Sequence, residues 1–570
     1  MRKIRKLIGL LLAAAMVFTM SAVAFADDSS ETRYSITIKN EKSGHTYEAY
    51  QIFSGDLKVE TVQNADGSAT EKRTLSNIEW GNGINGEALL GALKGAEDAP
   101  MAFKDCEDAA DVAAVLENYG TDSSEIKAFA DIAGQHLATR SGFSSTCVNG
   151  VYTITDLEAG YYLVKDLDKS LSGVEGDAYT DFILKVVDDT EAQPKSDVPS
   201  VEKKVQEDDK YKRDGGYGEG YNDVADWNIG DDVPFKLIGT VPDNLDDYET
   251  YKYIFHDTLS AGLTLNEGSI SVYVASNKEG TDKALISKEY YSVRTSDTAD
   301  KCSFEVAFVD LTAVPDVTAG KYIIVEYTAK LNTSAEIGLT GNPNKVYLEF
   351  SNNPNSGGEG DTGKTPEDEV IVFTYELDVT KISGEEGIAE TPLPGAEFKL
   401  YRQVTDADGN TVTEYVIVNS DGKVTGWTQI EADGSVLTAD ANGQFKVSGL
   451  DDGTYYLKET KAPDGYNLNS TPIKIEIDAT TNNGQNWAGG AKYALTNISV
   501  TDDSSDVEID KANTSANEGK VSIKVKNYPG SDLPETGGMG TRVIYALGVI
   551  LVLGSGAVLI ARKYFRKSNK

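Results

Sequence analysis

The alternation of apolar and polar residues predicts β-strands along most of the chain. Apolar or alternating runs rich in Val, Ile, Tyr and Phe occur at residues 34–39, 150–166, 181–187, 251–265, 321–331 and 345–355. Hairpin turn sequences (DADGN, NSDGK, EADGS and ANGQ) follow between residues 406 and 444. Short strands with regular turns are typical of β-sandwiches, so we expect a mainly β chain of tandem immunoglobulin-like or Cna-type sandwich domains.

A helical period interrupts this pattern in the first third of the chain. Apolar residues recur at helical spacing in two sets, Val112, Val115, Leu116 and Tyr119, and then Ile126, Phe129, Ala130 and Ala133. Asp122 with Glu125 predicts a capping box at the start of the second helix. We therefore expect helices inserted in the first domain, with these apolar faces in its core.

Polar joints and the two ends of the chain predict its domain organisation. Arg2 to Lys6, the apolar run Leu7–Val23 and a small-x-small cleavage sequence predict a signal peptide over residues 1–26. Stretches rich in Pro, Gly and Asp then separate domains at 27–196, 197–355 and 370–530, with a linker at 356–369. The remaining residues, 531–570, contain an apolar run at 543–561 that is long enough to span a bilayer, followed by a basic tail.

A short motif precedes that apolar run: Leu533, Pro534, Glu535, Thr536 and Gly537. Motif, apolar span and basic tail together resemble the cell-wall sorting signal of Gram-positive surface proteins. The resemblance implies a sortase, which cleaves between Thr536 and Gly537 and holds the chain as an acyl-enzyme until an amine takes it. It also implies secretion and anchoring to peptidoglycan. The alternative is an ordinary single-pass membrane anchor.

Composition narrows the possible functions. The formal net charge is −38, and both terminal segments carry only positive charge, so the mature chain is more acidic still and should repel nucleic acid. The chain has three cysteines, too few for a disulfide framework, although Cys106 and Cys147 could pair. The histidines, His45, His136 and His256, are scattered, so we expect no enzyme active site, metal site or cofactor.

The third domain resembles the collagen-adhesin B-type (CnaB) family in TYELDVTKISGEEG, GTYYLKETKAPDGY and VSIKVKNYPG. The resemblance implies a spontaneous isopeptide bond between Lys381 and Asn527, promoted by Glu459. Strand parity supports it, because Lys381 shares a face with Leu377 and Val379, as Asn527 does with apolar neighbours. Burial would favour a neutral, nucleophilic lysine and a protonated acid.

The middle domain resembles that of SpaA/FimA-type backbone pilins. The resemblance implies a second isopeptide bond, with Lys203 as the nucleophile, Asp257 as the acid and an Asn in the ending FSNNPN. Strand parity favours Lys203 over Lys204, and Asn352 over its neighbour. The first domain has Lys165-Asp166 where the third has Lys458-Glu459, and no closing strand ends in Asn, so we expect no such bond there.

The same resemblance, together with HTYEAYQIFSGDL (residues 45–57), implies the major shaft subunit of a sortase-assembled fimbrium that supports cell adhesion. Its pilin lysine is expected at Lys195, in Gln193-Pro194-Lys195, where the family's tyrosine is missing; Lys204 and Lys169 are competitors. The expected partners are a sortase, neighbouring pilin subunits and peptidoglycan. The alternative is a monomeric wall-anchored adhesin with a CnaB-type stalk that binds a host or matrix ligand.

Overall fold

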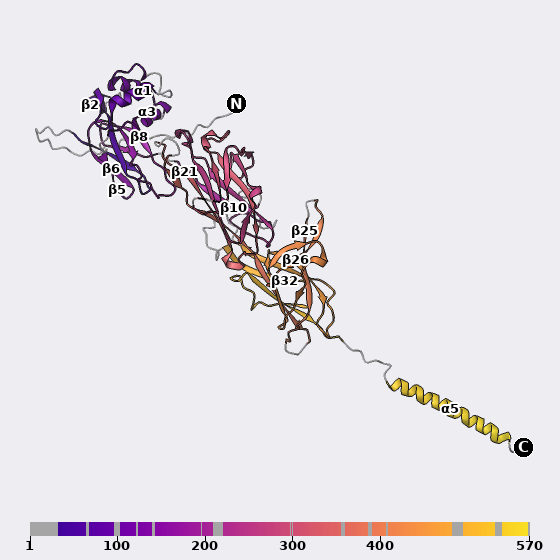
Figure 1. The fold of residues 1–570 in the computed structure, drawn as a ribbon. Coiled ribbons are helices and arrows are strands. Elements are labelled where there is room, and N and C mark those ends of the chain that lie inside the picture. Colours follow the sequence, from indigo (N-terminus) through magenta and orange to yellow (C-terminus); the bar gives the residue numbers. More distant parts are fainter. Residues whose placement is uncertain are drawn as a thin grey trace. The chain divides into compact units, whose positions relative to one another are not determined.

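The structure is a computed structural model of the chain. It describes residues 32–63, 68–95, 103–120, 123–138, 143–194, 197–208, 220–296, 298, 300–354, 360–385, 390–405, 408–481, 494–530 and 539–567. The predicted signal peptide, Lys195 and the motif from Leu533 to Gly537 lie outside the described residues. The chain divides into two compact units, Met1–Ser172 with Tyr179–Ser196, and Gly173–Ala178 with Asp197–Lys570 (Figure 1).

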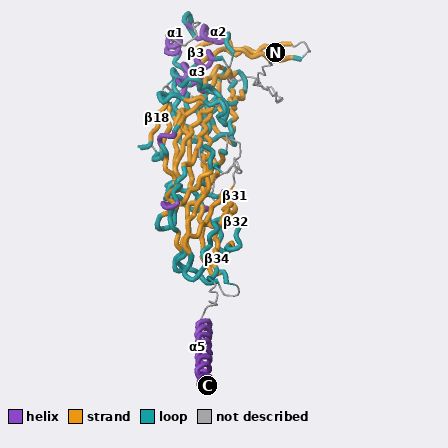
Figure 2. The backbone as a smooth tube through the Cα atoms, turned by 90° about the vertical axis from the view of Figure 1, so that its right-hand side faces the viewer, coloured by secondary structure: helices purple, strands orange, loops and turns teal. Residues whose placement is uncertain are grey.

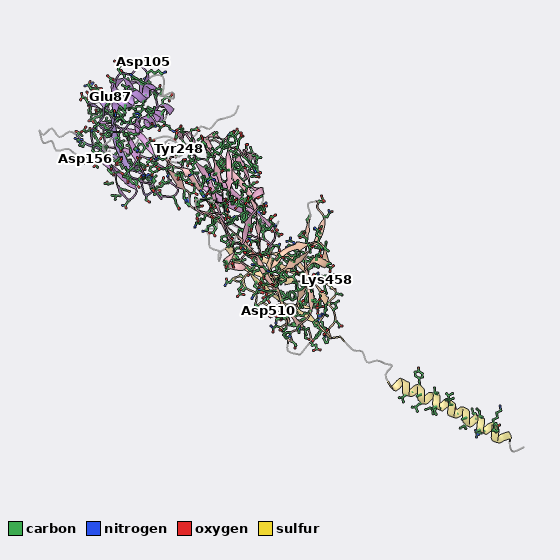
Figure 3. The ribbon with its side chains drawn as sticks, in the orientation of Figure 1. Glu87, Asp105, Asp156, Tyr248, Lys458 and Asp510 are labelled. Carbon is green, nitrogen blue, oxygen red and sulfur yellow. The ribbon has the colours of Figure 1, made fainter. Side chains whose placement is uncertain are left out.

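The first unit is a β-sandwich with helices added to one sheet. One sheet has the order β5 (Thr146–Val148), β6 (Val151–Leu157), β1 (Tyr34–Lys39) and β9 (Thr190–Ala192). The other has the order β3 (Ala69–Trp80), β2 (Tyr47–Gln63), β7 (Gly160–Asp166) and β8 (Asp181–Val186), with β4 (Phe143–Ser144) beside β2. Exposed carboxylates such as Glu87, Asp105 and Asp156 cover its surface, in line with the acidic composition (Figure 3).

The helices of this unit are α1 (Gly86–Gly95), α2 (Ala109–Leu116) and α3 (Ser124–Gly134), which lie near β3 in Figure 2. They pack apolar faces against β2 and β7 in one core cluster, as the sequence predicts for α2 and α3; α1 was not predicted. The predicted start of α3 was one residue early, because Ser123 is the N-cap and its hydroxyl accepts a hydrogen bond from the Ile126 amide. Cys106 is buried and Cys147 is exposed, and no disulfide joins them.

The second unit begins with a sandwich of two larger sheets. The first sheet has the order β11 (Tyr221–Asn222), β10 (Val201–Gln206), β13 (Asp232–Thr240), β20 (Tyr322–Leu331), β16 (Ser271–Ala275) and β17 (Ala284–Leu285), with β15 (Leu263–Leu265) beside β20. The second has the order β12 (Val224–Asp226), β23 (Asp368–Phe373), β21 (Asn342–Ser351), β14 (Tyr253–Leu259), β19 (Phe304–Phe308) and β18 (Tyr291–Arg294), with β22 (Thr362–Lys364) beside β21.

The segment predicted as a linker, 356–369, differs from that prediction. Part of it forms β22, and Asp368 opens β23, which pairs with both β21 and β12. Polar composition suggested a loop, but the apolar run Val370–Phe373 that follows is buried in the middle sandwich and draws the preceding residues into its sheet. The middle sandwich therefore continues to Phe373, and the third begins at Tyr375.

The third sandwich pairs a small sheet with a larger one. The small sheet has the order β29 (Gln444–Leu450), β24 (Tyr375–Ser383), β34 (Lys520–Asn527) and β33 (Val507–Ile509). The larger has the order β27 (Val424–Thr428), β26 (Thr411–Val418), β25 (Glu397–Thr405), β30 (Gly453–Lys461), β31 (Ile473–Thr481) and β32 (Leu495–Asp502), with β28 (Leu437–Thr438) beside β25. One continuous apolar core runs through the middle and third sandwiches. The predicted mainly β fold of tandem sandwiches is confirmed.

A last helix, α5 (Met539–Lys567), contains the predicted apolar run. Its part from Val543 to Tyr564, with mean hydropathy 2.5, is long and apolar enough to cross a membrane.

Candidate isopeptide sites

The two sheets of the third sandwich bring together Lys381, Glu459 and Asn527. Lys381 and Asn527 come from the parallel strands β24 and β34. Glu459 reaches them from β30 of the facing sheet. All three residues are buried, with 0, 4 and 2% exposure. The predicted lysine, acid and asparagine therefore lie in one buried site between the sheets.

Their polar atoms form a closed set of contacts. Lys381 Nζ lies 2.5 Å from Asn527 Oδ1 and 3.2 Å from Glu459 Oε1. Asn527 Nδ2 donates to both carboxylate oxygens of Glu459, at 3.0 and 3.1 Å. Glu459 Oε2 also accepts a hydrogen bond from the Asn469 amide at 2.7 Å, which fixes the carboxylate. One carboxylate thus contacts both the amine and the amide nitrogen, a geometry that suits proton transfer between them.

Burial changes the pKa of the Lys381 amine. Desolvation lowers the pKa of Lys381, and the nearby carboxylate of Glu459 opposes that shift only in part. The ring of Phe398, whose centroid lies 5.4 Å from Nζ, is part of the apolar surroundings. A lowered pKa increases the fraction of Lys381 whose amine is neutral and nucleophilic.

The middle sandwich holds a similar buried pair. Lys203 on β10 donates a hydrogen bond to Asp257 on β14, in the facing sheet, and both residues are fully buried. Burial lowers the pKa of Lys203 to about 8, although Asp257 opposes the shift, and burial raises the pKa of Asp257. Desolvation therefore favours the neutral forms of both groups, which the isopeptide reaction requires.

Asn352 does not lie with this pair. In the register of β14 with β21, Asp257 is opposite Val346, and Asn352 follows the end of β21, six residues further along. That separation is about 20 Å in an extended strand. The Asn352 amide nitrogen instead contacts the Asp177 carbonyl oxygen at 3.5 Å.

Asn344, near the other end of β21, lies at the site. Its amide nitrogen donates to the Tyr327 hydroxyl at 2.8 Å, and that hydroxyl donates to Asp257 Oδ2 at 2.9 Å. Lys203 Nζ contacts the carbonyl oxygen of the next residue, Lys345, at 3.3 Å. Asn344 is fully buried, and among the described residues its Oδ1 has no hydrogen-bond partner. Asn344 shares strand parity with Asn352, so parity could not tell them apart.

The competing acceptor lysines occupy different environments. Lys204 is buried, and its amine pairs with Asp223. Lys169 is exposed, in a turn with φ of 67°. In the first unit, Lys165 pairs with Asp168 at 2.9 Å. The buried Asp166 forms a hydrogen bond with His45 Nδ1 at 2.8 Å.

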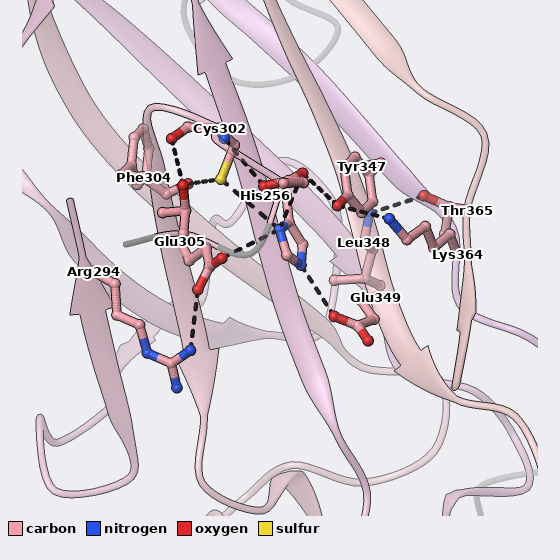
Figure 4. Close-up of polar contacts among 12 residues, drawn as sticks. His256, Arg294, Cys302, Phe304, Glu305, Tyr347, Leu348, Glu349, Lys364 and Thr365 are labelled. Carbon is pink, nitrogen blue, oxygen red and sulfur yellow. Dashed lines mark hydrogen bonds and ion pairs between the residues drawn. The ribbon is translucent and has the colours of Figure 1, made fainter. Parts of the chain in front are cut away.

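Sequence reasoning missed a second polar cluster in the middle sandwich. His256 follows Phe255 on β14 and points away from Asp257, into a group that includes Cys302, Glu305 and Glu349 (Figure 4). Burial and the neighbouring Asp300 raise the pKa of the Cys302 thiol to about 12. These residues come from separate strands and a loop, so no short spacing in the sequence marks them.

Comparison with known proteins agrees with the mainly β fold. Residues 376–488 match the SpaA prealbumin-like fold domain. The chain is 25% identical over 421 residues, 65% of its length and 69% of the relative's, to the trypsin-resistant surface T6 protein of Streptococcus pyogenes serotype M6. It is 24% identical over 253 residues, 42% of each chain, to fimbrial subunit type 1 of Actinomyces viscosus.

Solved structures that match this chain include the T6 backbone pilin of S. pyogenes, with 18% identity and a TM-score of 0.49 over 88% of this chain and 100% of that one. Another is the major pilin SpaD of Corynebacterium diphtheriae, with 19% identity and a TM-score of 0.45 over 89% and 100%. The resemblance to Gram-positive pilins predicted from the sequence is confirmed by the sequence relatives and the domain match.

Proposed function

We propose that this chain is the structural shaft subunit of a sortase-assembled Gram-positive pilus, stabilised inside each subunit by Lys–Asn isopeptide bonds. The observation that carries the proposal is the buried set of Lys381, Glu459 and Asn527, with the lysine amine 2.5 Å from the asparagine side chain. The similarity of the chain to a T6 surface protein and to a fimbrial subunit supports the same proposal.

In the third sandwich, neutral Lys381 Nζ attacks the Asn527 side-chain carbonyl carbon. Glu459 takes the proton that the amine loses and delivers it to Asn527 Nδ2, which it already contacts at 3.0 Å. The new bond joins Nζ to Cγ, and the bond from Cγ to Nδ2 breaks with release of ammonia. The acid ends the reaction in its starting form, and both joined residues belong to the same chain, so the reaction is a self-modification.

In the middle sandwich, the same reaction joins Lys203 to Asn344, in place of the Asn352 that strand parity suggested. Neutral Asp257 gives its proton to the leaving nitrogen through the Tyr327 hydroxyl, which lies between Asp257 and Asn344, and then takes the proton that Lys203 loses. Ammonia leaves, and Asp257 returns to its neutral form. The middle and third sandwiches then each have their first strand covalently tied to a strand near their end.

Subunits are joined by a third linkage. Sortase cleaves after Thr536, and the Lys195 amine of a neighbouring subunit takes the acyl group, or the cell-wall precursor takes it at the base of the polymer. Lys195 stands next to the boundary between the two units, Ser196/Asp197. The buried, paired amine of Lys204 makes it a poor competitor, whereas Lys169 stays available.

An immunoblot of wall extracts boiled in detergent tests the function itself. We expect a ladder of very high masses, because the subunit linkages are covalent. A single monomer band in cells that hold the cognate sortase would favour the wall-anchored adhesin.

The intact mass of the purified chain from Asp27 to Thr536 should fall short of its sequence mass by two ammonia molecules. Each isopeptide bond expels one, and the middle and third sandwiches each hold a complete set. High-resolution intact-protein mass spectrometry decides this. The full sequence mass would eliminate both bonds, and a deficit of one ammonia would eliminate one.

Asn344→Ala should remove one ammonia from that deficit, whereas Asn352→Ala should leave the deficit unchanged. Both residues are buried and lie on or beside β21, so the pair controls for loss of a buried amide. Peptide mapping should find Lys203 crosslinked to Asn344 in the Asn352→Ala chain. If Asn352→Ala removes one ammonia from the deficit and Asn344→Ala does not, the bond of the middle sandwich is formed by Asn352.

A further inference from the structure

His256 Nδ1 faces three side-chain atoms of ligand type. Asp300 Oδ2 lies 3.5 Å away, Glu305 Oε1 3.6 Å and Cys302 Sγ 3.8 Å. The four ligand atoms lie within 4.8 Å of one another (Figure 4). The register explains the convergence, since His256 on β14 is directly opposite Glu305 on β19, while the loop before β19 supplies Asp300 and Cys302.

Hydrogen bonds account for only part of this cluster: the Tyr347 hydroxyl donates to Asp300 Oδ2 at 2.5 Å, and the Cys302 thiol donates to the Phe304 carbonyl oxygen at 3.4 Å. The contacts from His256 Nδ1 to both carboxylates exceed the 2.7 to 3.2 Å of an N–H···O bond, and one ring nitrogen has one proton at most to share among three neighbours. In a tetrahedral zinc site, by contrast, bonds of 2.0 to 2.3 Å place neighbouring ligand atoms about 3.3 to 3.6 Å apart. The spacing around Nδ1 is close to that value.

The residues that surround the four ligands also favour metal binding. His256 Nε2 contacts Glu349 Oε2 at 3.3 Å, and with the ring proton on that side the Nδ1 lone pair would face the cluster. Arg294 holds the other oxygen of Glu305 at 3.2 Å. The Tyr347 ring stacks on His256 with centroids 4.4 Å apart, so the imidazole has a fixed plane.

Asp300 is the most exposed of the four ligand residues. The side chains of His256 and Glu305 are 3 and 2% exposed, whereas that of Asp300 is 28% exposed. A cation can therefore arrive past Asp300 and become enclosed by the other three ligands.

We propose that His256, Asp300, Cys302 and Glu305 bind one Zn²⁺ ion, which ties β14, β19 and the loop between β18 and β19 together. Imidazole and thiolate ligands favour zinc over the hard cations calcium and magnesium. On binding, the Cys302 thiol releases its proton to solvent, and the sulfur forms the metal bond in its place. The site stands on the opposite face of β14 from Asp257 and does not depend on the isopeptide bonds or on polymerisation.

Cobalt and zinc titrations of the full chain in dodecyl maltoside test the site. In a Cys106→Ser, Cys147→Ser background, Cys302 is the remaining cysteine. We expect one Co²⁺ per chain, with the near-ultraviolet sulfur-to-cobalt charge-transfer band and visible bands of a tetrahedral site, and displacement of both by one equivalent of Zn²⁺. Zinc should also raise the melting temperature of this background chain.

Two variants separate ligation from general damage. Cys302→Ser should abolish the charge-transfer band and weaken Zn²⁺ binding at least tenfold, while its melting temperature in EDTA stays near that of the background chain. Glu349→Gln should keep the band and weaken binding about 10- to 100-fold, as expected for a residue that orients a ligand.

His136→Gln is the matched control, because His136 bonds the Ile132 carbonyl oxygen in the other unit and should leave every metal readout unchanged. If the background chain binds no Co²⁺ stoichiometrically, or if its spectrum is the same with Cys302→Ser, the cluster is a set of ordinary polar contacts and the zinc site is wrong.

Discussion

Glu459→Ala should leave Lys381 and Asn527 unjoined and lower the melting temperature of the third sandwich by about 10 to 20 °C. The residues are 146 positions apart, so the bond closes a loop of about 147 residues. A chain-entropy estimate made for disulfides gives about 5 kcal/mol for such a loop. In a domain of this size each kcal/mol corresponds to about 2 to 4 °C. Intact mass and calorimetry on the same sample measure both effects.

Glu476→Ala is the matched control for that change. Glu476 is an exposed carboxylate on the adjacent strand β31, where it pairs with Lys474 at 3.3 Å. Such surface pairs contribute at most about 1 kcal/mol, so the mass deficit and the melting temperature should be close to those of the parent. A parental mass in the Glu459→Ala chain would mean that another acid promotes the bond.

The sequence predicted Lys381 and Asn527 of the third domain because the alternation of apolar and polar residues shows which face of each strand is buried. In β24 and β34 every second residue faces the core, so Lys381 and Asn527 had to be buried if their apolar neighbours were. The long resemblance around Glu459 then supplied the third residue. Local alternation and a family motif were enough here.

The asparagine of the middle sandwich shows where such reasoning stops. Parity says which face of β21 a residue occupies, and Asn344 and Asn352 occupy the same one. Position along the strand depends on the pairing of β21 with β14, which sets Val346 opposite Asp257. That register comes from tertiary packing over nearly a hundred residues of chain, which a single strand's sequence does not encode.

The sequence did not predict the histidine cluster, for a related reason. His256 and Cys302 are 46 residues apart and become neighbours because β14 and β19 pair across the sheet. Sequence searches for metal sites rely on short fixed spacings, which arise when ligands share one turn or helix. Ligands contributed by paired strands leave no such spacing.

Lys195→Arg should abolish the high-mass ladder while monomer stays on the cell surface. In the proposed assembly, cleavage after Thr536 depends on the sorting motif, so the acyl-enzyme should still form. A guanidinium keeps the positive charge but stays protonated and cannot act as the nucleophile, so transfer to the wall precursor becomes the remaining exit. An immunoblot of boiled wall extracts, with surface labelling of intact cells, measures both outcomes.

Lys169→Arg is the matched control, since Lys169 is exposed and lies in the same unit as the proposed acceptor. It should leave the ladder unchanged. Because Lys203 and Lys381 lie in the other unit, the intact mass of the Lys195→Arg chain should still show the deficit of two ammonia molecules, which separates loss of polymerisation from misfolding. A ladder of normal length in Lys195→Arg, together with its loss in Lys169→Arg, would move the intersubunit bond to Lys169 and keep the shaft function.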